Sequence, residues 1–269
     1  MSKLKELKEL RNKLNLTVKG IENLPEGNAI YVSNHVCLLD GLYIPAALNK
    51  DVVSIVSSRL VYKKNDRLKN VEKYLNAFPV EAHGGKVYSD LCLKYVLEIL
   101  KNNIDINMFP EGAYIEDNSI VTKGRVGAAK LLFDIRDEGI YYDLVPISIN
   151  IKNKIDDLDN FVINDNEVEI TISKPINTND QYYDYTQTNN EKEKRKIYHD
   201  IIDESMKKIA LSMNKNFSNE YIELYPKGNV IFSNGEVVDK IEAQDKRYVL
   251  KYENELINRT NKYIKDLKK

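Results

Sequence analysis

Short apolar runs rich in β-branched residues alternate with segments of helical period through the middle of this chain. The expected strands are residues 28–33, 52–56, 75–80, 104–109, 144–151 and 168–172. The expected helices are residues 38–48, 89–102 and 126–137, and Pro45 is expected to kink or end the first of them. Strands that alternate with helices of this length are typical of an α/β fold with a mostly parallel central sheet flanked by helices.

The N-terminus carries an amphipathic and basic pattern. Leucines recur there at steps of three and four residues, at Leu4, Leu7, Leu10 and Leu14, so residues 1–17 are expected to form a helix. Residues 1–20 hold six basic and two acidic side chains. Two interpretations stay open: the helix lies on an anionic membrane surface, or it covers its own domain with its lysines in solvent.

The C-terminal part of the chain has a different composition. Residues 177–190 are polar and are expected to form a loop, and a charged helix with an apolar stripe is expected over 191–213. Asn234-Gly235 is a good hairpin signal, and residues 241–266 have the period of a last amphipathic helix. Residues 214–269 are therefore expected to form a hairpin-plus-helix appendage of unknown role.

The composition argues against several classes of protein. The formal net charge is −1 at pH 7, which does not indicate a nucleic-acid binder. The two cysteines make neither a disulfide framework nor a metal-ligand pattern, so a reducing compartment is expected. No run approaches the roughly 20 apolar residues that span a bilayer. The expected location is cytoplasmic, or peripheral on the inner face of the membrane.

A histidine and an aspartate stand five positions apart where the first expected strand ends. Residues five apart in one continuous helix point about 140° away from each other and do not meet. His35 and Asp40 can meet if His35 lies on the turn that leaves the strand and Asp40 in the first turn of the next helix. Asp40 would then hold one imidazole nitrogen and leave the other as a general base. Taken alone, this spacing also arises by chance.

Two further blocks follow along the chain. Phe109-Pro110-Glu111-Gly112 places a carboxylate in a constrained turn after a strand, a position typical of a functional site at the end of a sheet. The alternative is a turn carboxylate that caps the next segment. The apolar run around Val145-Pro146-Ile147 is a buried strand interrupted by a proline, and its apolar residues are expected in the core.

Together, in this order and spacing, these blocks resemble the glycerolipid acyltransferase superfamily typified by 1-acylglycerol-3-phosphate acyltransferases. The family's Asn-His-x4-Asp stands here as Asn34, His35 and Asp40. Its Phe-Pro-Glu-Gly turn contains Pro110, and its Lys-Gly before the next helix is similar to Lys123-Gly124. The resemblance covers about residues 18–213, which are expected to form the acyltransferase domain.

The resemblance implies an acyltransferase of lipid metabolism. It would move an acyl group from acyl-CoA or acyl carrier protein to a hydroxyl of a lipid-like acceptor, or to a small alcohol or amine. His35 would act as the general base and Asp40 would orient it, Glu111 and Gly112 would bind the acceptor, and backbone N–H groups near the turn would stabilise the oxyanion. The resemblance implies no metal and no cofactor, since the acyl donor is a co-substrate.

Two other functions remain as alternatives. In an acyl thioester hydrolase, water would take the place of the acceptor. The second alternative is a non-catalytic module that binds acyl-CoA or lipid. Such a module would need a His–Asp pair that has lost its activity, and the presence of both His35 and Asp40 argues against this alternative.

The sequence departs from the family pattern where an acceptor phosphate would bind. The family's third-block threonine and arginine are replaced by Ala113 and Tyr114, and Ala82 stands where the second block usually offers an arginine. Because guanidinium groups bind phosphate bidentately, these losses put lysophosphatidate in doubt as the acceptor. Arg125 is the nearby candidate to substitute for them, or it is a surface arginine.

Two features allow both a chemical and a structural interpretation. Cys37, two residues after the histidine, is either a nucleophile or a small buried side chain.

A run of basic residues follows the second expected strand. It could bind the phosphates of CoA or the acidic face of a carrier protein, or it is a helix face exposed to solvent. Its members are Arg59, Lys63, Lys64, Arg67, Lys69 and Lys73.

Overall fold

The computed structural model divides the chain into two compact units. The first contains Met1–Lys50 and Asn107–Ile222, and the second contains Asp51–Ile106 and Glu223–Lys269. The described residues are 7, 9, 11–37, 39–62, 76–81, 84–113, 119–152, 167–222 and 229–268. These units are defined by contacts between residues. The expected domain boundaries after residues 17 and 213 were drawn from the sequence pattern, and they stay a prediction.

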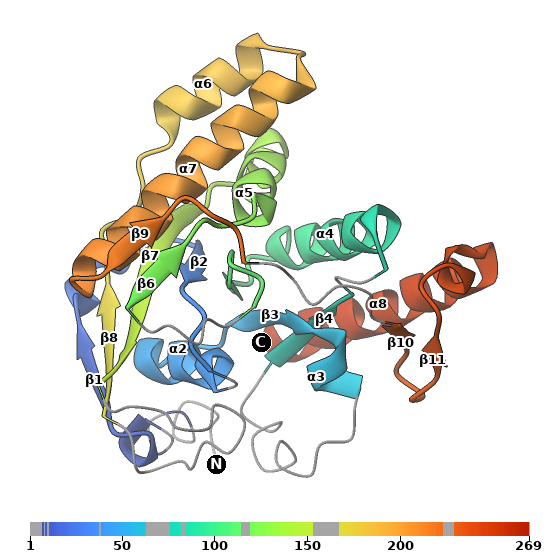
Figure 1. Ribbon diagram of the computed structural model, residues 1–269, viewed down its shortest axis with the longest axis horizontal. Coiled ribbons are helices and arrows are strands. Elements are labelled where there is room, and N and C mark those ends of the chain that lie inside the picture. The colour runs from blue at the N-terminus through green and yellow to red at the C-terminus, as the bar shows by residue number, and fades with distance from the viewer. Residues whose placement is uncertain are drawn as a thin grey trace. The chain divides into compact units, whose positions relative to one another are not determined.

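The first unit is built on a sheet with the strand order β1-β8-β7-β2-β5 (Figure 1). Its strands are β1 (Leu16–Lys19), β2 (Ala29–Ser33), β5 (Ile106–Met108), β7 (Asp143–Ile151) and β8 (Val168–Ile172), with a separate short pair of β6 (Ile120–Thr122) and β9 (Asn216–Ser218). The pairs β1–β8 and β2–β7 are parallel, and β7–β8 is antiparallel. The α/β fold with a mostly parallel sheet is therefore confirmed.

Helices of the first unit cover this sheet. They are η1 (Ile21–Asn23), α2 (Asp40–Leu48), α5 (Gly127–Asp137), α6 (Asn179–Gln187) and α7 (Glu191–Ser212). Both α5 and α7 contact β2 and β7, and α6 packs on α7. All five residues of β2 are buried, which is expected for a central strand of a parallel sheet whose sequence is continuously apolar.

The second unit contains the parallel pair β3 (Val53–Ser57) and β4 (Asn76–Val80). Its helices are α3 (Ser58–Tyr62), α4 (Lys86–Leu100) and α8 (Lys246–Leu267), with the turn η2 (Glu242–Gln244) before α8. The strands β10 (Val230–Ile231) and β11 (Val237–Val238) pair antiparallel across Asn234-Gly235, which confirms the expected hairpin. The last helix packs on α4 and β4, so the C-terminal segment joins residues 51–106 in one compact unit.

Side chains of α8 bind backbone groups along β4. The hydroxyl of Tyr263 and a guanidinium nitrogen of Arg259 donate to Ala77 O at 2.6 and 2.8 Å. The hydroxyl of Tyr252 accepts from Glu81 N at 3.1 Å and donates to Pro79 O at 3.4 Å. These backbone groups belong to alternate residues, so they point to the same edge of the strand. A strand edge covered in this way is protected from pairing with another chain.

The expected loop at 177–190 is wrong, because α6 forms there. The residues of α6 have weak intrinsic helix propensity, and contacts with α5 compensate for it. Tyr182 and Tyr185 pack against Phe133, and their hydroxyls donate to Asp137 at 2.7 and 3.2 Å. Such tertiary contacts leave no local signal in the sequence.

Of the two effects expected of Pro45, ending the helix is wrong, while a kink stays a prediction. Helix α2 continues to Leu48, and all of its residues are buried. Proline removes one backbone donor from the helix, and the burial of its mostly apolar side chains outweighs that loss. The short elements β1, α3, β6 and β9 were not predicted, because runs of three to five residues carry little periodicity.

The N-terminal segment is helical at the described residues 7, 9 and 11–13. The expected helix over residues 1–17 is wrong at its C-terminal end, because Leu16 and Thr17 lie in β1 and pair with β8. Leu7 and Leu14 are 1% and 3% exposed, while Glu9 is exposed. The apolar face therefore packs against the protein, which favours the interpretation that this helix covers its own domain. Leu4 and Leu10 lie outside the described residues. Among those that are described, no helix is both long enough and apolar enough to span a membrane.

We predict that Tyr252→Phe lowers the free energy of unfolding by about 1–3 kcal/mol, because two buried backbone groups each lose a hydrogen-bond partner. Urea unfolding measures the change. Tyr248→Phe is the matched control, since Tyr248 lies on the same helix and its hydroxyl bonds Glu242 at the surface. Equal destabilisation by the two variants would contradict a specific role of Tyr252 at β4.

Candidate active site

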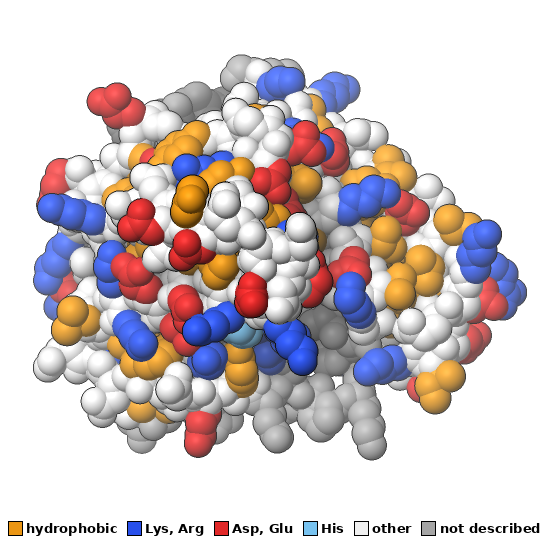
Figure 2. All heavy atoms as spheres, turned by 90° about the horizontal axis from the view of Figure 1, so that it is seen from above, with side chains coloured by type: hydrophobic (Ala, Val, Ile, Leu, Met, Phe, Trp, Pro, Cys, Tyr) orange, Lys and Arg blue, Asp and Glu red, His pale blue; other side chains and the backbone are white. Residues whose placement is uncertain are grey.

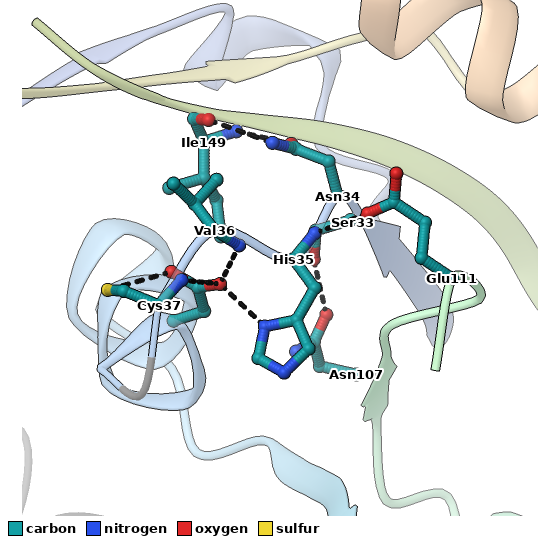
Figure 3. Close-up of polar contacts among 9 residues, drawn as sticks. Ser33, Asn34, His35, Val36, Cys37, Asn107, Glu111 and Ile149 are labelled. Carbon is teal, nitrogen blue, oxygen red and sulfur yellow. Dashed lines mark hydrogen bonds and ion pairs between the residues drawn. The ribbon is translucent and has the colours of Figure 1, made fainter. Parts of the chain in front are cut away.

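The turn after β2 is fixed to the neighbouring strand by Asn34. The Asn34 amide donates to Ile149 O at 2.9 Å and accepts from Ile149 N at 2.8 Å (Figure 3). Because β2 and β7 are parallel neighbours with Ser33 opposite Ile147, this side chain continues their ladder one step beyond the end of β2. The chain therefore leaves the sheet at a defined point.

His35 and Asp40 meet as the sequence predicted. His35 follows the end of β2, Asp40 is the first residue of α2, and His35 Nδ1 lies 2.7 Å from Asp40 Oδ2. The Asp40 side chain is fully buried, whereas the His35 side chain is 21% exposed. The same carboxylate accepts hydrogen bonds from the backbone N–H groups of Val36 and Cys37. These donors compensate for the loss of water around a buried carboxylate.

This contact orients the imidazole. An N–H at Nδ1 that donates to Asp40 places the lone pair of the ring on Nε2, which is the arrangement of a general base. The ring also stacks on Phe109, with 4.6 Å between ring centroids and 25° between ring planes. The imidazole is thus held at one nitrogen and on one face.

Glu111 binds the backbone of the same turn. One carboxylate oxygen, Oε2, accepts from His35 N at 2.7 Å, while Oε1 accepts from Thr122 N at 2.9 Å and from Thr122 Oγ1 at 3.3 Å. Glu111 is 1% exposed, and this burial raises its pKa to about 7, although the hydrogen bonds from Thr122 and His35 oppose the shift. Glu111 therefore connects the Phe-Pro-Glu-Gly turn and β6 to His35.

The rest of the Phe-Pro-Glu-Gly turn is closed by its own backbone. Gly112 has a positive φ of 80°, which glycine adopts without strain, and Gly112 N donates to Phe109 O at 3.0 Å. Pro110 O accepts from Arg125 N at 2.7 Å. Gly112 is exposed, while both oxygens of Glu111 accept from protein groups. Acceptor binding by Glu111 and Gly112 stays a prediction.

The backbone donors expected for the oxyanion are already used at three positions of the turn. The N–H of His35 donates to Glu111, and the N–H groups of Val36 and Cys37 donate to Asp40. The expectation that N–H groups near the turn stabilise an oxyanion is therefore wrong for these three residues. The physical reason is that two buried carboxylates need the same donors.

Lys123 and Arg125 follow β6 and are both tied to other parts of the first unit. Lys123 Nζ lies 3.1 Å from Asp203 Oδ2, and an Arg125 guanidinium nitrogen donates to Ile222 O at 3.2 Å. Each cation lies 5.7 Å from the centre of the Tyr221 ring. Arg125 is thus close to the third block through Pro110 but is engaged by the segment after β9.

Cys37 has the properties of a buried structural residue. It is fully buried, and its thiol donates to Asp40 Oδ1 at 3.3 Å. Burial, and secondly the negative charge of Asp40, raise the pKa of the Cys37 thiol well above its ordinary value. Because a nucleophile needs the thiolate, this environment favours the structural interpretation.

Several predicted positions lie outside the described residues. These are Ala82, Tyr114 and the basic run from Lys63 to Lys73. The other member of that run, Arg59, begins the first turn of α3 and donates to Asn229 O at 3.2 Å. No cluster of three or more potential metal ligands occurs among the described residues, and the expected absence of a metal or cofactor stays a prediction.

Sequence reasoning missed three residues of this site: Thr122, Asn107 and Ser33. Thr122 holds Glu111, and Ser33 Oγ donates to Asn107 Oδ1 at 2.9 Å (Figure 3). Each is an ordinary polar residue within or at the end of a strand. No local signal distinguishes them, because their importance depends on which strands become neighbours.

The class of this protein as an acyltransferase follows from a match to a family model. A model of the family described as Acyltransferase matches residues 15–150, more than half of the 269 residues, and the chain therefore belongs to that family. The matched region contains His35, Asp40 and Glu111. The expected membership of an acyltransferase family is confirmed.

A solved structure has a similar fold. It is described as the 1-acyl-sn-glycerophosphate (LPA) acyltransferase, PlsC, from Thermotoga maritima, and it matches with a TM-score of 0.53 at 20% sequence identity. The match covers 76% of this chain and 78% of that chain. At this identity the likeness is one of fold. The search of curated proteins gave no match.

We predict that Glu111 makes the stability of the protein depend on pH. Because its pKa is about 7 in the folded protein against an ordinary value of 4.5, the unfolded chain loses this proton first as the pH rises. The contribution of Glu111 to stability should therefore fall between pH 4.5 and about 7. Urea unfolding at pH 5 and pH ~7.5 should show a smaller fall for Glu111→Gln than for the wild type.

The control is Glu22→Gln, which changes an exposed carboxyl in the same unit. It should leave the difference between the two pH values as in the wild type. A Glu111→Gln variant with the full wild-type pH dependence would show that another group is responsible.

Proposed function

We propose that this protein transfers an acyl group from acyl-CoA or acyl carrier protein to a hydroxyl of a lipid-like acceptor. The observation that carries the proposal is the contact of 2.7 Å between His35 Nδ1 and the buried Asp40 carboxylate, within a chain of the Acyltransferase family. The pair supplies a base, an orienting group and a compensating charge at the end of a central strand.

His35 acts as a general base and then as a general acid in this proposal. Nε2 removes the proton from the acceptor hydroxyl, whose oxygen attacks the thioester carbonyl carbon. The tetrahedral intermediate collapses, the carbon–sulfur bond breaks, and the sulfur takes the proton from the imidazolium. Asp40 stabilises the imidazolium between these steps, because its carboxylate lies 2.7 Å from Nδ1.

Glu111 positions His35 through the backbone in this proposal. Its contacts run to His35 N and Thr122, and its side chain is buried, so it acts on the shape of the turn. Glu111 and Gly112 of the third block remain the proposed acceptor-binding residues, together with Arg125, whose N–H donates to Pro110 O. Asn34, Pro110 and Lys123 support the turn and the segments on either side of it.

The acceptor proposed here lacks a phosphomonoester. Ala82 and Tyr114 stand where the family's arginines are expected. Arg125 donates to Ile222 O and Lys123 pairs with Asp203, so binding a phosphate would compete with contacts these cations already make. An alcohol or amine without a phosphate monoester does not require these cations to bind a phosphate.

The proposed partners are an acyl donor and a membrane surface. Lys and Arg side chains alternate with Asp and Glu side chains over the face shown in Figure 2, in keeping with a net charge of −1. This mixture of charges does not favour a nucleic-acid partner. Because Leu7 and Leu14 face the protein, peripheral membrane contact would use the basic side of the N-terminal helix. The proposed location stays cytoplasmic, or peripheral on the inner face of the membrane.

We predict that His35→Ala lowers the turnover of acyl transfer by about 10²- to 10⁴-fold while the protein stays folded. Asp40→Asn should also lower turnover by about 10²-fold or more, because the imidazole loses its orienting acceptor and compensating charge. Thiol release from acyl-CoA in the presence of an acceptor, together with thermal unfolding, measures both effects. Asp180→Asn, an exposed aspartate on α6, is the control.

Product analysis in the same assay separates transfer from hydrolysis. Acylated acceptor as the main product supports the proposal, and free fatty acid as the main product with every acceptor would identify a thioester hydrolase. Wild-type turnover retained by a correctly folded His35→Ala variant would exclude the proposed base.

We predict that lysophosphatidate is a poor acceptor beside monoacylglycerol, which differs from it only in lacking the phosphate. Two lost charge-assisted contacts weaken binding of a desolvated phosphate by ~100-fold or more. Comparing kcat/KM for the two acceptors measures the difference. Efficient use of lysophosphatidate, abolished by Arg125→Ala, would show that Arg125 has taken over the phosphate.

A further inference from the structure

Acyl transfer requires hydrogen-bond donors for the carbonyl oxygen of the thioester. Negative charge develops on that oxygen when the acceptor attacks, and donors already in place lower the barrier. The N–H groups of His35, Val36 and Cys37 are engaged by Glu111 and Asp40. At these three positions, the turn that carries the base therefore offers the oxyanion no donor.

Asn107 on β5 carries a donor of the required kind. Asn107 is fully buried, and its Oδ1 accepts a hydrogen bond from Ser33 Oγ at 2.9 Å. Its Nδ2 is a buried side-chain nitrogen without a hydrogen-bond partner in the part of the chain that the structure describes. Buried polar atoms are nearly always paired, so an unpaired amide in a folded protein calls for a functional explanation.

The strands place this amide beside the imidazole. On one chain segment, Ser33 lies two residues before His35. On the neighbouring segment, Asn107 lies two residues before Phe109. Ser33 contacts Asn107, and His35 stacks on Phe109. Residues two apart along an extended chain point to the same side. Asn107 and Phe109 thus form a row alongside Ser33 and His35. Figure 3 shows the Asn107 amide on the same side of the turn as the His35 ring.

We propose that Asn107 Nδ2 donates a hydrogen bond to the thioester carbonyl oxygen in the transition state. This inference rests on the proposed function. When the acceptor oxygen bonds to the carbonyl carbon, the carbonyl electron pair moves to its oxygen, and the displaced proton is held by His35. When the tetrahedral intermediate collapses, the carbonyl forms again and the carbon–sulfur bond breaks. His35 then gives its proton to the departing sulfur. Asn107 stays neutral and changes no covalent bond.

The surroundings of Asn107 suit this role. The Ser33 hydroxyl fixes the amide by its oxygen, which leaves the nitrogen as the donor end. Because Nδ2 is shielded from solvent, a carbonyl oxygen that reaches it meets a donor in a site of low dielectric, where such a bond is worth more than in water. The alternative role is purely structural: Asn107 would only attach β5 to Ser33.

Two substitutions separate these roles. Asn107→Ala removes the donor and the anchor, whereas Asn107→Asp keeps an acceptor for Ser33 Oγ, replaces the donor with a second carboxylate oxygen and adds a negative charge. Both should lower kcat by about 10²- to 10³-fold, the effect of losing one oxyanion donor. The control is Thr260→Val on α8, which removes a buried hydroxyl that likewise lacks a partner among the described residues, in the other compact unit. This control should keep wild-type turnover.

The kinetic pattern tests where Asn107 acts. The loss should be the same with a hydroxyl acceptor and with water, because both reactions pass through the same oxyanion. KM of each acceptor, and binding of a non-cleavable thioether analogue of acyl-CoA, should change by less than about threefold. A rise confined to the KM of the acceptor, or a loss of turnover that parallels a loss of thermal stability, would overturn the inference.

The remaining outcomes are equally decisive. If the wild type cleaves acyl thioesters and folded Asn107→Asp does so within about fivefold of it, Asn107 is not the donor, and the proposed function stands. If the wild type cleaves no acyl thioester, the proposed function fails and the inference fails with it.

Discussion

The site depends on two buried carboxylates that bind the backbone of one turn. Asp40 accepts from His35 Nδ1 and from the N–H groups of Val36 and Cys37, and Glu111 accepts from the N–H of His35. Burying a carboxylate is costly unless hydrogen bonds replace its water, so each carboxylate fixes the donors around it. The result is an imidazole in one orientation. The same contacts leave the backbone of residues 35–37 without donors for substrate.

This arrangement reaches well beyond the turn. Thr122 holds Glu111 at the end of β6, and β6 pairs in parallel with β9, with Thr122 opposite Ser218. Segments far apart in the sequence therefore keep the base in place. A substitution in β9 could alter catalysis without touching substrate, because it would act through Thr122 and Glu111. The Acyltransferase match ends at residue 150, so β9 supports the site from outside the matched region.

The second unit shows how a C-terminal segment can complete a sheet. Tyr252, Arg259 and Tyr263 of α8 bind backbone groups at alternate positions of β4. Exposed strand edges invite pairing with other chains, and a helix that occupies the edge prevents it. This gives α8 a structural role in its own compact unit.

The sequence by itself determined the order of most of the longer strands and helices, the hairpin at Asn234-Gly235, and the meeting of His35 with Asp40. These follow from apolar periodicity and from the geometry of a strand-to-helix turn, which act over a few residues. Only the tertiary structure decided that α6 forms, that Glu111 binds the His35 backbone, and that Asn107 has an unpaired amide beside the site. Each depends on contacts between residues distant in sequence. Which polar groups become neighbours, and which are left without a partner, is decided only when the strands have assembled.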